Sequence, residues 1–141
     1  MKKGIGLIEI LIIVAVAALI IAVTLPKILV GWRLGNESAA QATLKTISAA
    51  LQAYSSDNNG FYAPMDSVNS DKYLRTTTPF FLNKAYCGQT DNGYLFSCNV
   101  NKTTYVLTAR PQNCTSAGTK SFTATTGGML VTDQSCAPAG D

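Results

Sequence analysis

Residues 5–25 read IGLIEILIIVAVAALIIAVTL, a run of 21 residues in which Glu9 carries the only charge. Because an α-helix rises about 1.5 Å per residue, a helix of this length is about 30 Å long and matches the hydrocarbon core of a bilayer. The segment therefore predicts a helix that can cross a membrane. Lys2 and Lys3 precede it, and the positive-inside rule keeps that end in the cytoplasm and sends the rest of the chain outward.

A membrane anchor alone does not explain the acid at Glu9. A lone carboxylate in hydrocarbon costs about 3 kcal/mol and marks a functional position that needs a partner. No basic side chain lies within residues 5–25, so the partner is a chain terminus or another molecule. An ordinary cleaved signal is an alternative for the segment, but residues 22–32, AVTLPKILVGW, contain no clear A-x-A cleavage pattern.

The stretch KKG, residues 2–4, followed by IGLIEILIIVAVAALIIAVTLP resembles the class III leader and N-terminal helix of type IV pilins and type II secretion pseudopilins. In that family a prepilin peptidase cuts after the glycine, here Gly4, and methylates the new N-terminal residue, here Ile5. The resemblance implies that Glu9 pairs with the N-terminal amine of an adjacent subunit inside a filament. Ile5 stands where the family most often has Phe, and Gly6 stands where it often has Thr, so we expect Gly6 to loosen the first turn.

The apolar segment is expected to continue into an amphipathic helix. Pro26 lacks an N–H group and predicts a kink or a local loss of helix. Residues 36–60, NESAAQATLKTISAALQAYSSDNNG, then place apolar side chains three or four positions apart. The Asp/Asn/Gly cluster predicts that the helix ends near Ser56. The apolar stripe consists of Ala40, Leu44, Ile47, Leu51 and Tyr54.

Four short alternating runs follow a mostly irregular stretch. They are YLFSCNV (94–100), TYVLTAR (104–110), KSFTATT (120–126) and MLVTD (129–133). Their spacing predicts an antiparallel meander of four strands covered by the apolar face of the helix. The fold class is therefore α+β, with a long N-terminal helix on a four-stranded antiparallel sheet, an arrangement that resembles the pilin fold. The expected divisions are a leader (1–4), a membrane or filament-core helix (5–25), an amphipathic helix (26–56), a connecting loop (57–92), and a sheet with a disulfide-stapled C-terminal region (93–141).

The four cysteines, Cys87, Cys98, Cys114 and Cys136, predict two disulfides and an oxidising compartment. A zinc site is the alternative, but the chain has no C-x-x-C pair and no histidine. Of the three possible pairings we favour Cys87 with Cys98 and Cys114 with Cys136, because both close local loops. The ends of the second and fourth predicted strands also lie at the same edge of the sheet, next to Cys114 and Cys136.

Charge and motif content exclude several classes of function. The net charge is +3, yet from residue 34 onward seven Lys and Arg balance seven Asp and Glu, so no basic face is expected for nucleic acid. No catalytic constellation, P-loop or G-x-S-x-G motif is present, so we expect no enzyme, cofactor or metal. The acids Asp57, Asp66, Asp71 and Asp91 lack the D-x-D spacing of a calcium site.

The expected function is that of a type IV pilus subunit, held in the inner membrane as a precursor and then displayed on the bacterial surface. Its expected partners are further copies of itself, the prepilin peptidase and the pilus assembly platform. A pseudopilin of a type II secretion system is the alternative within the family. A third hypothesis, from a different class, is a monomeric periplasmic binding or enzyme domain on a signal anchor.

Overall fold

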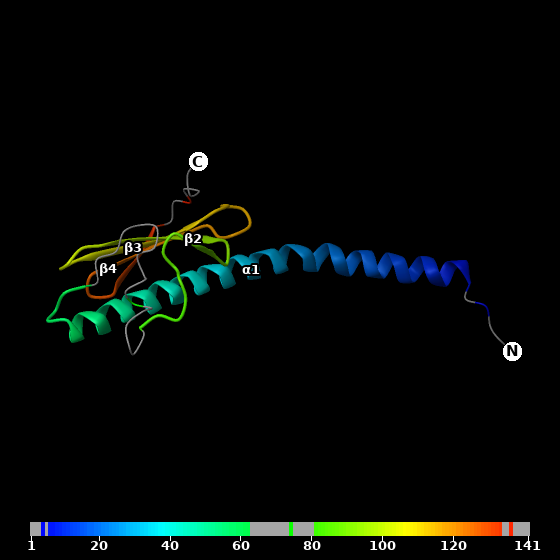
Figure 1. The fold of residues 1–141 in the computed structure, drawn as a ribbon. Coiled ribbons are helices and arrows are strands. Elements are labelled where there is room, and N and C mark those ends of the chain that lie inside the picture. The colour runs from blue at the N-terminus through cyan, green and yellow to red at the C-terminus, as the bar shows by residue number, and fades with distance from the viewer. Residues whose placement is uncertain (1–3, 5, 63–73, 75–80, 134–135, 137–141) are drawn as a thin grey trace. The chain divides into compact units, whose positions relative to one another are not determined.

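The computed structural model describes residues 4, 6–62, 74, 81–133 and 136. The chain divides into two units, Met1–Trp32 and Arg33–Asp141. The first described element is the helix α1 (Leu7–Asp57), and a five-stranded antiparallel sheet follows it (Figure 1). The fold class is α+β, as the sequence predicts.

Helix α1 is 51 residues long and begins and ends within two residues of its predicted bounds. The helix continues through Pro26, Gly31 and Gly35 without a break. The predicted local loss of helix at Pro26 is therefore wrong. Proline lacks one backbone N–H and so removes one hydrogen bond, which a helix with good helix-forming residues on both sides can tolerate. The kink at Pro26 stays a prediction.

The second half of α1 lies along the sheet (Figure 1). Its predicted apolar stripe is the part that packs, since Leu44, Ile47 and Leu51 are fully buried and Ala40 is nearly so. Tyr54 is half-buried at the edge of the same cluster. The helical spacing of these side chains thus decides which face of α1 meets the sheet.

The sheet strands follow one another in space in the order of the sequence. They are β1 (Thr90–Asp91), β2 (Tyr94–Val100), β3 (Tyr105–Pro111), β4 (Ser121–Thr125) and β5 (Met129–Asp133), and each pairs antiparallel with the next. The four predicted strands are all present, but the predicted strand number is wrong because β1 adds a fifth.

The extra strand β1 arises from a tight hairpin. Asn92 and Gly93 have φ angles of 49° and 76°, the left-handed values that a two-residue turn between twisted strands requires. The pair Asp91 and Tyr94 closes this turn. The N-G dipeptide was the signal in the sequence, and the strand itself is too short for an alternating pattern to reveal it.

One face of the sheet forms the core together with α1. Along β2 and β3 buried and exposed residues alternate, with every second side chain directed to the helix. The sheet residues of the buried hydrophobic core cluster are Tyr94, Phe96, Cys98, Val100, Tyr105, Leu107, Ala109, Phe122 and Ala124.

A polar contact fixes how α1 docks on the sheet. The hydroxyl groups of Ser48 and Tyr105 are 2.6 Å apart and both residues are buried. The same phenol oxygen accepts hydrogen bonds from Gln52 Nε2 at 3.3 Å and from the backbone N–H of Gly128 at 3.1 Å. Since buried polar groups are costly without partners, this network stabilises one register between helix and sheet.

Two disulfides close the sheet region. Cys87 bonds to Cys98 with Cα atoms 5.5 Å apart, and Cys114 bonds to Cys136 with Cα atoms 5.7 Å apart. This is the pairing that the sequence favoured. Residues 63–73 and 75–80 of the predicted connecting loop lie outside the described residues. Within it Leu74 is fully buried, and its carbonyl accepts hydrogen bonds from the N–H groups of Phe81 and Leu82.

Candidate functional site

The first candidate site is the start of α1 around Glu9. The backbone N–H of Gly6 donates to Glu9 Oε2 at 3.2 Å, and the carbonyl of Gly6 accepts from the N–H groups of Glu9 and Ile10. Gly6 is therefore the N-cap residue, and Glu9 reaches back to it as in a capping box. From the sequence we expected Gly6 to loosen the first turn and did not predict its role as N-cap. The sequence does contain a signal for that role, because glycine is accepted at the N-cap and Glu9 follows three positions later.

The predicted cleavage site is only partly described. Gly4 is exposed and lies before the helix, with no atom within 4 Å of the position a Cβ would take. Ile5, at which the family resemblance places both the cut and the methyl group, lies outside the described residues. The cleavage and methylation therefore stay predictions.

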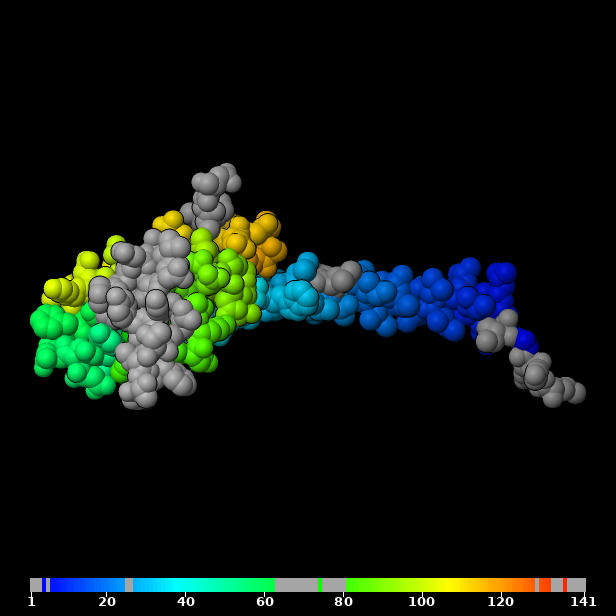
Figure 2. All heavy atoms as spheres, viewed as in Figure 1, coloured from blue at the N-terminus to red at the C-terminus, as the bar shows by residue number. Residues whose placement is uncertain are grey.

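The apolar surface of α1 is extensive. Between Leu7 and Val23 the large aliphatic side chains are exposed, from 52% at Val16 to 83% at Leu7. This stretch is the blue part of the helix in Figure 2. Such an amount of exposed aliphatic surface is incompatible with a helix standing in water. By length and composition this helix is able to cross a membrane.

The hydroxyl within the apolar segment is satisfied locally. Thr24 Oγ1 donates to the carbonyl of Ile20 at 3.0 Å. A threonine that bonds back to its own helix presents no unpaired donor to lipid or to a neighbouring helix. Glu9 is therefore the one group in residues 6–25 whose burial would need a charged partner.

A second polar site ties α1 to the loop between β3 and β4. Glu37, 6% exposed, accepts hydrogen bonds from the backbone N–H of Thr119 at 2.9 Å and from its hydroxyl at 3.0 Å. Tyr94, fully buried, donates its phenol hydrogen to the carbonyl of Lys120 at 2.9 Å. The three hydrogen bonds hold the loop against helix and sheet. Sequence reasoning missed Glu37, because its partner is 82 residues away.

Burial and charge alter Tyr94. Removal from water raises the pKa of Tyr94 to about 12, and the nearby negative charge of Glu37 adds to the effect. A Cβ placed on Gly118 would lie 2.0 Å from the hydroxyl oxygen of Tyr94. A side chain at this position would therefore require the loop or Tyr94 to shift.

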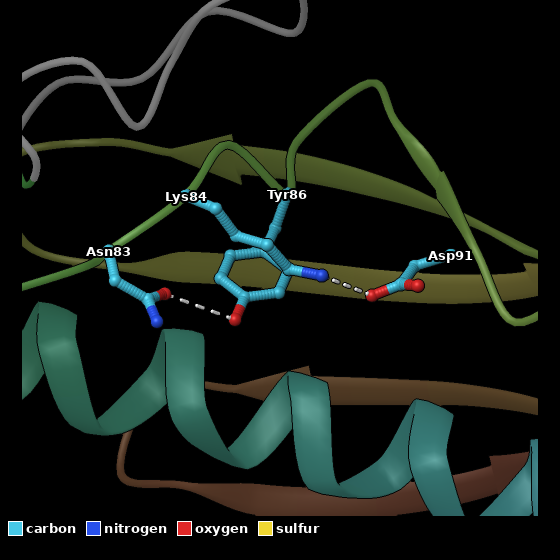
Figure 3. Close-up of polar contacts among 4 residues, drawn as sticks. All are labelled: Asn83, Lys84, Tyr86 and Asp91. Carbon is cyan, nitrogen blue, oxygen red and sulfur yellow. Dashed lines mark hydrogen bonds and ion pairs between the residues drawn. The ribbon is translucent and has the colours of Figure 1, made fainter.

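A cluster on the surface orders the segment before β1 (Figure 3). Lys84 Nζ lies 2.7 Å from Asp91 Oδ2 and 4.9 Å from the ring centroid of Tyr86, whose hydroxyl donates to Asn83 Oδ1 at 3.5 Å. The hydrogen bond to Asp91 raises the pKa of Lys84. Exposed ion pairs of this kind contribute little to stability. We therefore assign the cluster the role of orienting the chain next to Cys87 and not that of stabilising the fold.

The described residues contain no group of three or more His, Cys, Asp or Glu side chains able to hold a metal ion. Asp91 is paired with Lys84, and Asp57 ends α1. Asp66 and Asp71 lie outside the described residues.

Comparisons with known proteins assign no family to the chain. No family model matches it, and no curated protein matches it. What the molecule itself presents is a pilin-like architecture: a long apolar N-terminal helix packed through its second half on an antiparallel sheet with disulfides.

Proposed function

We propose that this protein is a structural subunit of a type IV pilus. The precursor is held in the inner membrane, is cut after Gly4 and is methylated at Ile5. Copies then pack the apolar half of α1 into a central bundle and display the sheet region on the cell surface.

The observation that carries the proposal is the exposed aliphatic surface of α1 together with the lone acid at Glu9. Covering that surface requires lipid before assembly or identical helices after it. Removal of residues 1–4 would create a cationic amine close to the start of α1, and the amine of a neighbouring copy is a suitable partner for Glu9. The two disulfides support a sheet region outside the cytoplasm.

The test is the intact mass of the purified protein. A mass that begins at Ile5 and includes one added methyl group, with both disulfides formed, is expected. A retained Met1, or a cut beyond Leu25, would contradict the proposal and favour a domain on a signal anchor or behind an ordinary signal.

Electron microscopy of material sheared from the cell surface separates the two members of the family. Long filaments that contain this chain are expected for a pilus subunit. If the mature mass is found but the chain stays in the cell envelope and forms no surface filament, the pseudopilin alternative takes its place.

A further inference from the structure

A groove of about 350 Å³ opens at the end of α1 and is not used by the proposed assembly of the apolar helix. It is lined by Tyr54, Asn58, Phe61, Tyr62 and Lys102. Figure 2 shows the green end of α1 beside the yellow-green turn between β2 and β3, the two regions that supply these residues. The volume is at the lower end of the range for small-molecule sites.

The backbone on one side of the groove is held by a helix cap. Asn59 has a φ of 57°, and the N–H of Gly60 donates to the carbonyl of Ser55 at 2.8 Å, which reverses the chain after α1. The N–H of Tyr62 then donates to the carbonyl of Lys102 at 2.9 Å. The two sides of the groove are thus joined by a hydrogen bond.

Two aromatic rings of the groove are held in place by ring contacts with residues outside its lining. Tyr62 packs at a steep angle on the buried Tyr105, with ring centroids 5.1 Å apart and an interplanar angle of 89°. Tyr54 packs on Phe81 in the same manner, at 5.9 Å and 72°. Phe61 is 51% exposed and adds a third ring. Rings held in one orientation lose little entropy when a ligand stacks on them.

Several polar groups of the groove have hydrogen-bonding positions that no described residue occupies. Asn58 Nδ2 donates to the carbonyl of Tyr54, and the amide oxygen remains as an acceptor. Among the described residues, no hydrogen bond is formed by the hydroxyl groups of Tyr54 and Tyr62, and no ion pair is formed by the Lys102 ammonium. Among the described residues of the lining, Lys102 is the one that carries a charge, and its ammonium favours an anion.

We propose that this groove binds a sugar unit that carries a carboxylate, such as a hexuronate. Sugar rings present apolar C–H faces that stack on aromatic side chains and hydroxyl groups that exchange hydrogen bonds with phenols and amides. The carboxylate pairs with the ammonium of Lys102. The chemistry needs no polymerisation, so the inference stands or fails separately from the pilus assignment.

The test uses the full chain in micelles of a zwitterionic detergent without a sugar head group. Saturation-transfer NMR and titration compare methyl glucuronide with methyl glucoside as probes. The glucuronide is expected to bind, and about five- to tenfold more tightly than the glucoside, because only the acid forms the charge-assisted bond.

Three variants locate the binding. Lys102→Gln is expected to abolish the preference for the acid, while Lys45→Gln, at an exposed lysine of α1 outside the groove, leaves it unchanged. Phe61→Ala is expected to weaken both sugars at least about threefold through the lost ring contact. Circular dichroism melting confirms that each variant is folded.

Three results would overturn the proposal. The first is no transfer to either sugar with the folded wild-type chain. The second is an unchanged preference for the acid in Lys102→Gln. The third is a Phe61→Ala variant that binds sugar normally but forms fewer filaments, which would assign the groove to contacts between copies of the chain.

Discussion

Two single acids in this chain have opposite surroundings. Glu9 is exposed and bonds to the N–H of Gly6, whereas Glu37 is buried and bonds to Thr119. Glu37 has a partner within its own chain. Glu9 has only a local cap, which leaves its charge uncompensated should the helix be covered by apolar groups.

Glu9→Gln separates the capping role from the charge. The amide oxygen still accepts from the N–H of Gly6, but no ion pair with a neighbouring amine can form. Under the proposed pilus assembly, filament yield in sheared surface material is expected to fall at least about tenfold, because an amine left unpaired in the filament core would cost several kcal/mol. The proposed removal of the leader, followed by mass, is expected to be unaffected. If Glu9→Gln forms a wild-type amount of filament while Glu9→Ala forms less, the hydrogen bond to Gly6 and not the charge of Glu9 is what assembly needs.

Because of Tyr94, the free energy of unfolding is expected to fall at alkaline pH. Its pKa is raised to about 12 in the folded protein, whereas an unfolded tyrosine ionises near about 10. The folded state therefore holds the phenol proton more firmly. This contribution is fully present below pH 10 and is lost as the pH rises from about 10 to about 12. Urea unfolding of the full chain in detergent should show the decline, and Tyr94→Phe should flatten it. Equal slopes for both proteins would rule out Tyr94 as the group.

At the level of elements, the alternating strands and the helical stripe could be read from the sequence because each depends on side chains close along the chain. Leu44, Ile47 and Leu51 are buried where the stripe places them. The contacts that position the loop after β3 could not be read. They join Glu37 to Thr119 and Tyr94 to Lys120, and no local pattern records a partner so distant in sequence.

Gly118→Ala tests how tightly that loop is packed. The new methyl group would lie 2.0 Å from the hydroxyl oxygen of Tyr94 and 3.1 Å from Glu37 Cγ, so the loop or the tyrosine must shift. We expect a loss of about 1–3 kcal/mol in the free energy of unfolding, measured with urea. Gly35→Ala is the matched control, because nothing lies within 4 Å of its Cβ position and alanine favours the helix. Equal stability of the two variants would contradict the packing seen at Gly118.

For the whole molecule, the most informative parts of the sequence were the few cysteines and the long apolar run. Cysteine positions and the strand order together favoured the pairing that the structure has, and the apolar run and the Asp/Asn/Gly cluster predicted where α1 begins and ends. The groove at the end of α1 was not foreseen, since Tyr54 and Lys102 come from elements 48 residues apart in the sequence and meet only through tertiary packing.

Removing either disulfide as a double serine variant should lower the free energy of unfolding by about 3 kcal/mol, given the loops they close. Replacement of Cys87 and Cys98 should cost more than loop entropy alone, because both side chains are buried in the core, at 1% and 3% exposure. Replacement of Cys114 and Cys136, which lie nearer the surface, should cost the smaller amount. The reverse order in urea unfolding would contradict this ranking.

The strand order has a consequence for the order in which the two disulfides form. Every strand pairs with the next one along the chain, so hairpins can form one after another with little loop to close. Cys98 lies within β2 and can meet Cys87 early, whereas Cys136 follows the last strand. The second disulfide joins residues on either side of β4 and β5, so we expect it to form after these strands have paired. A thiol-trapping time course should then find Cys87 and Cys98 joined before Cys114 and Cys136.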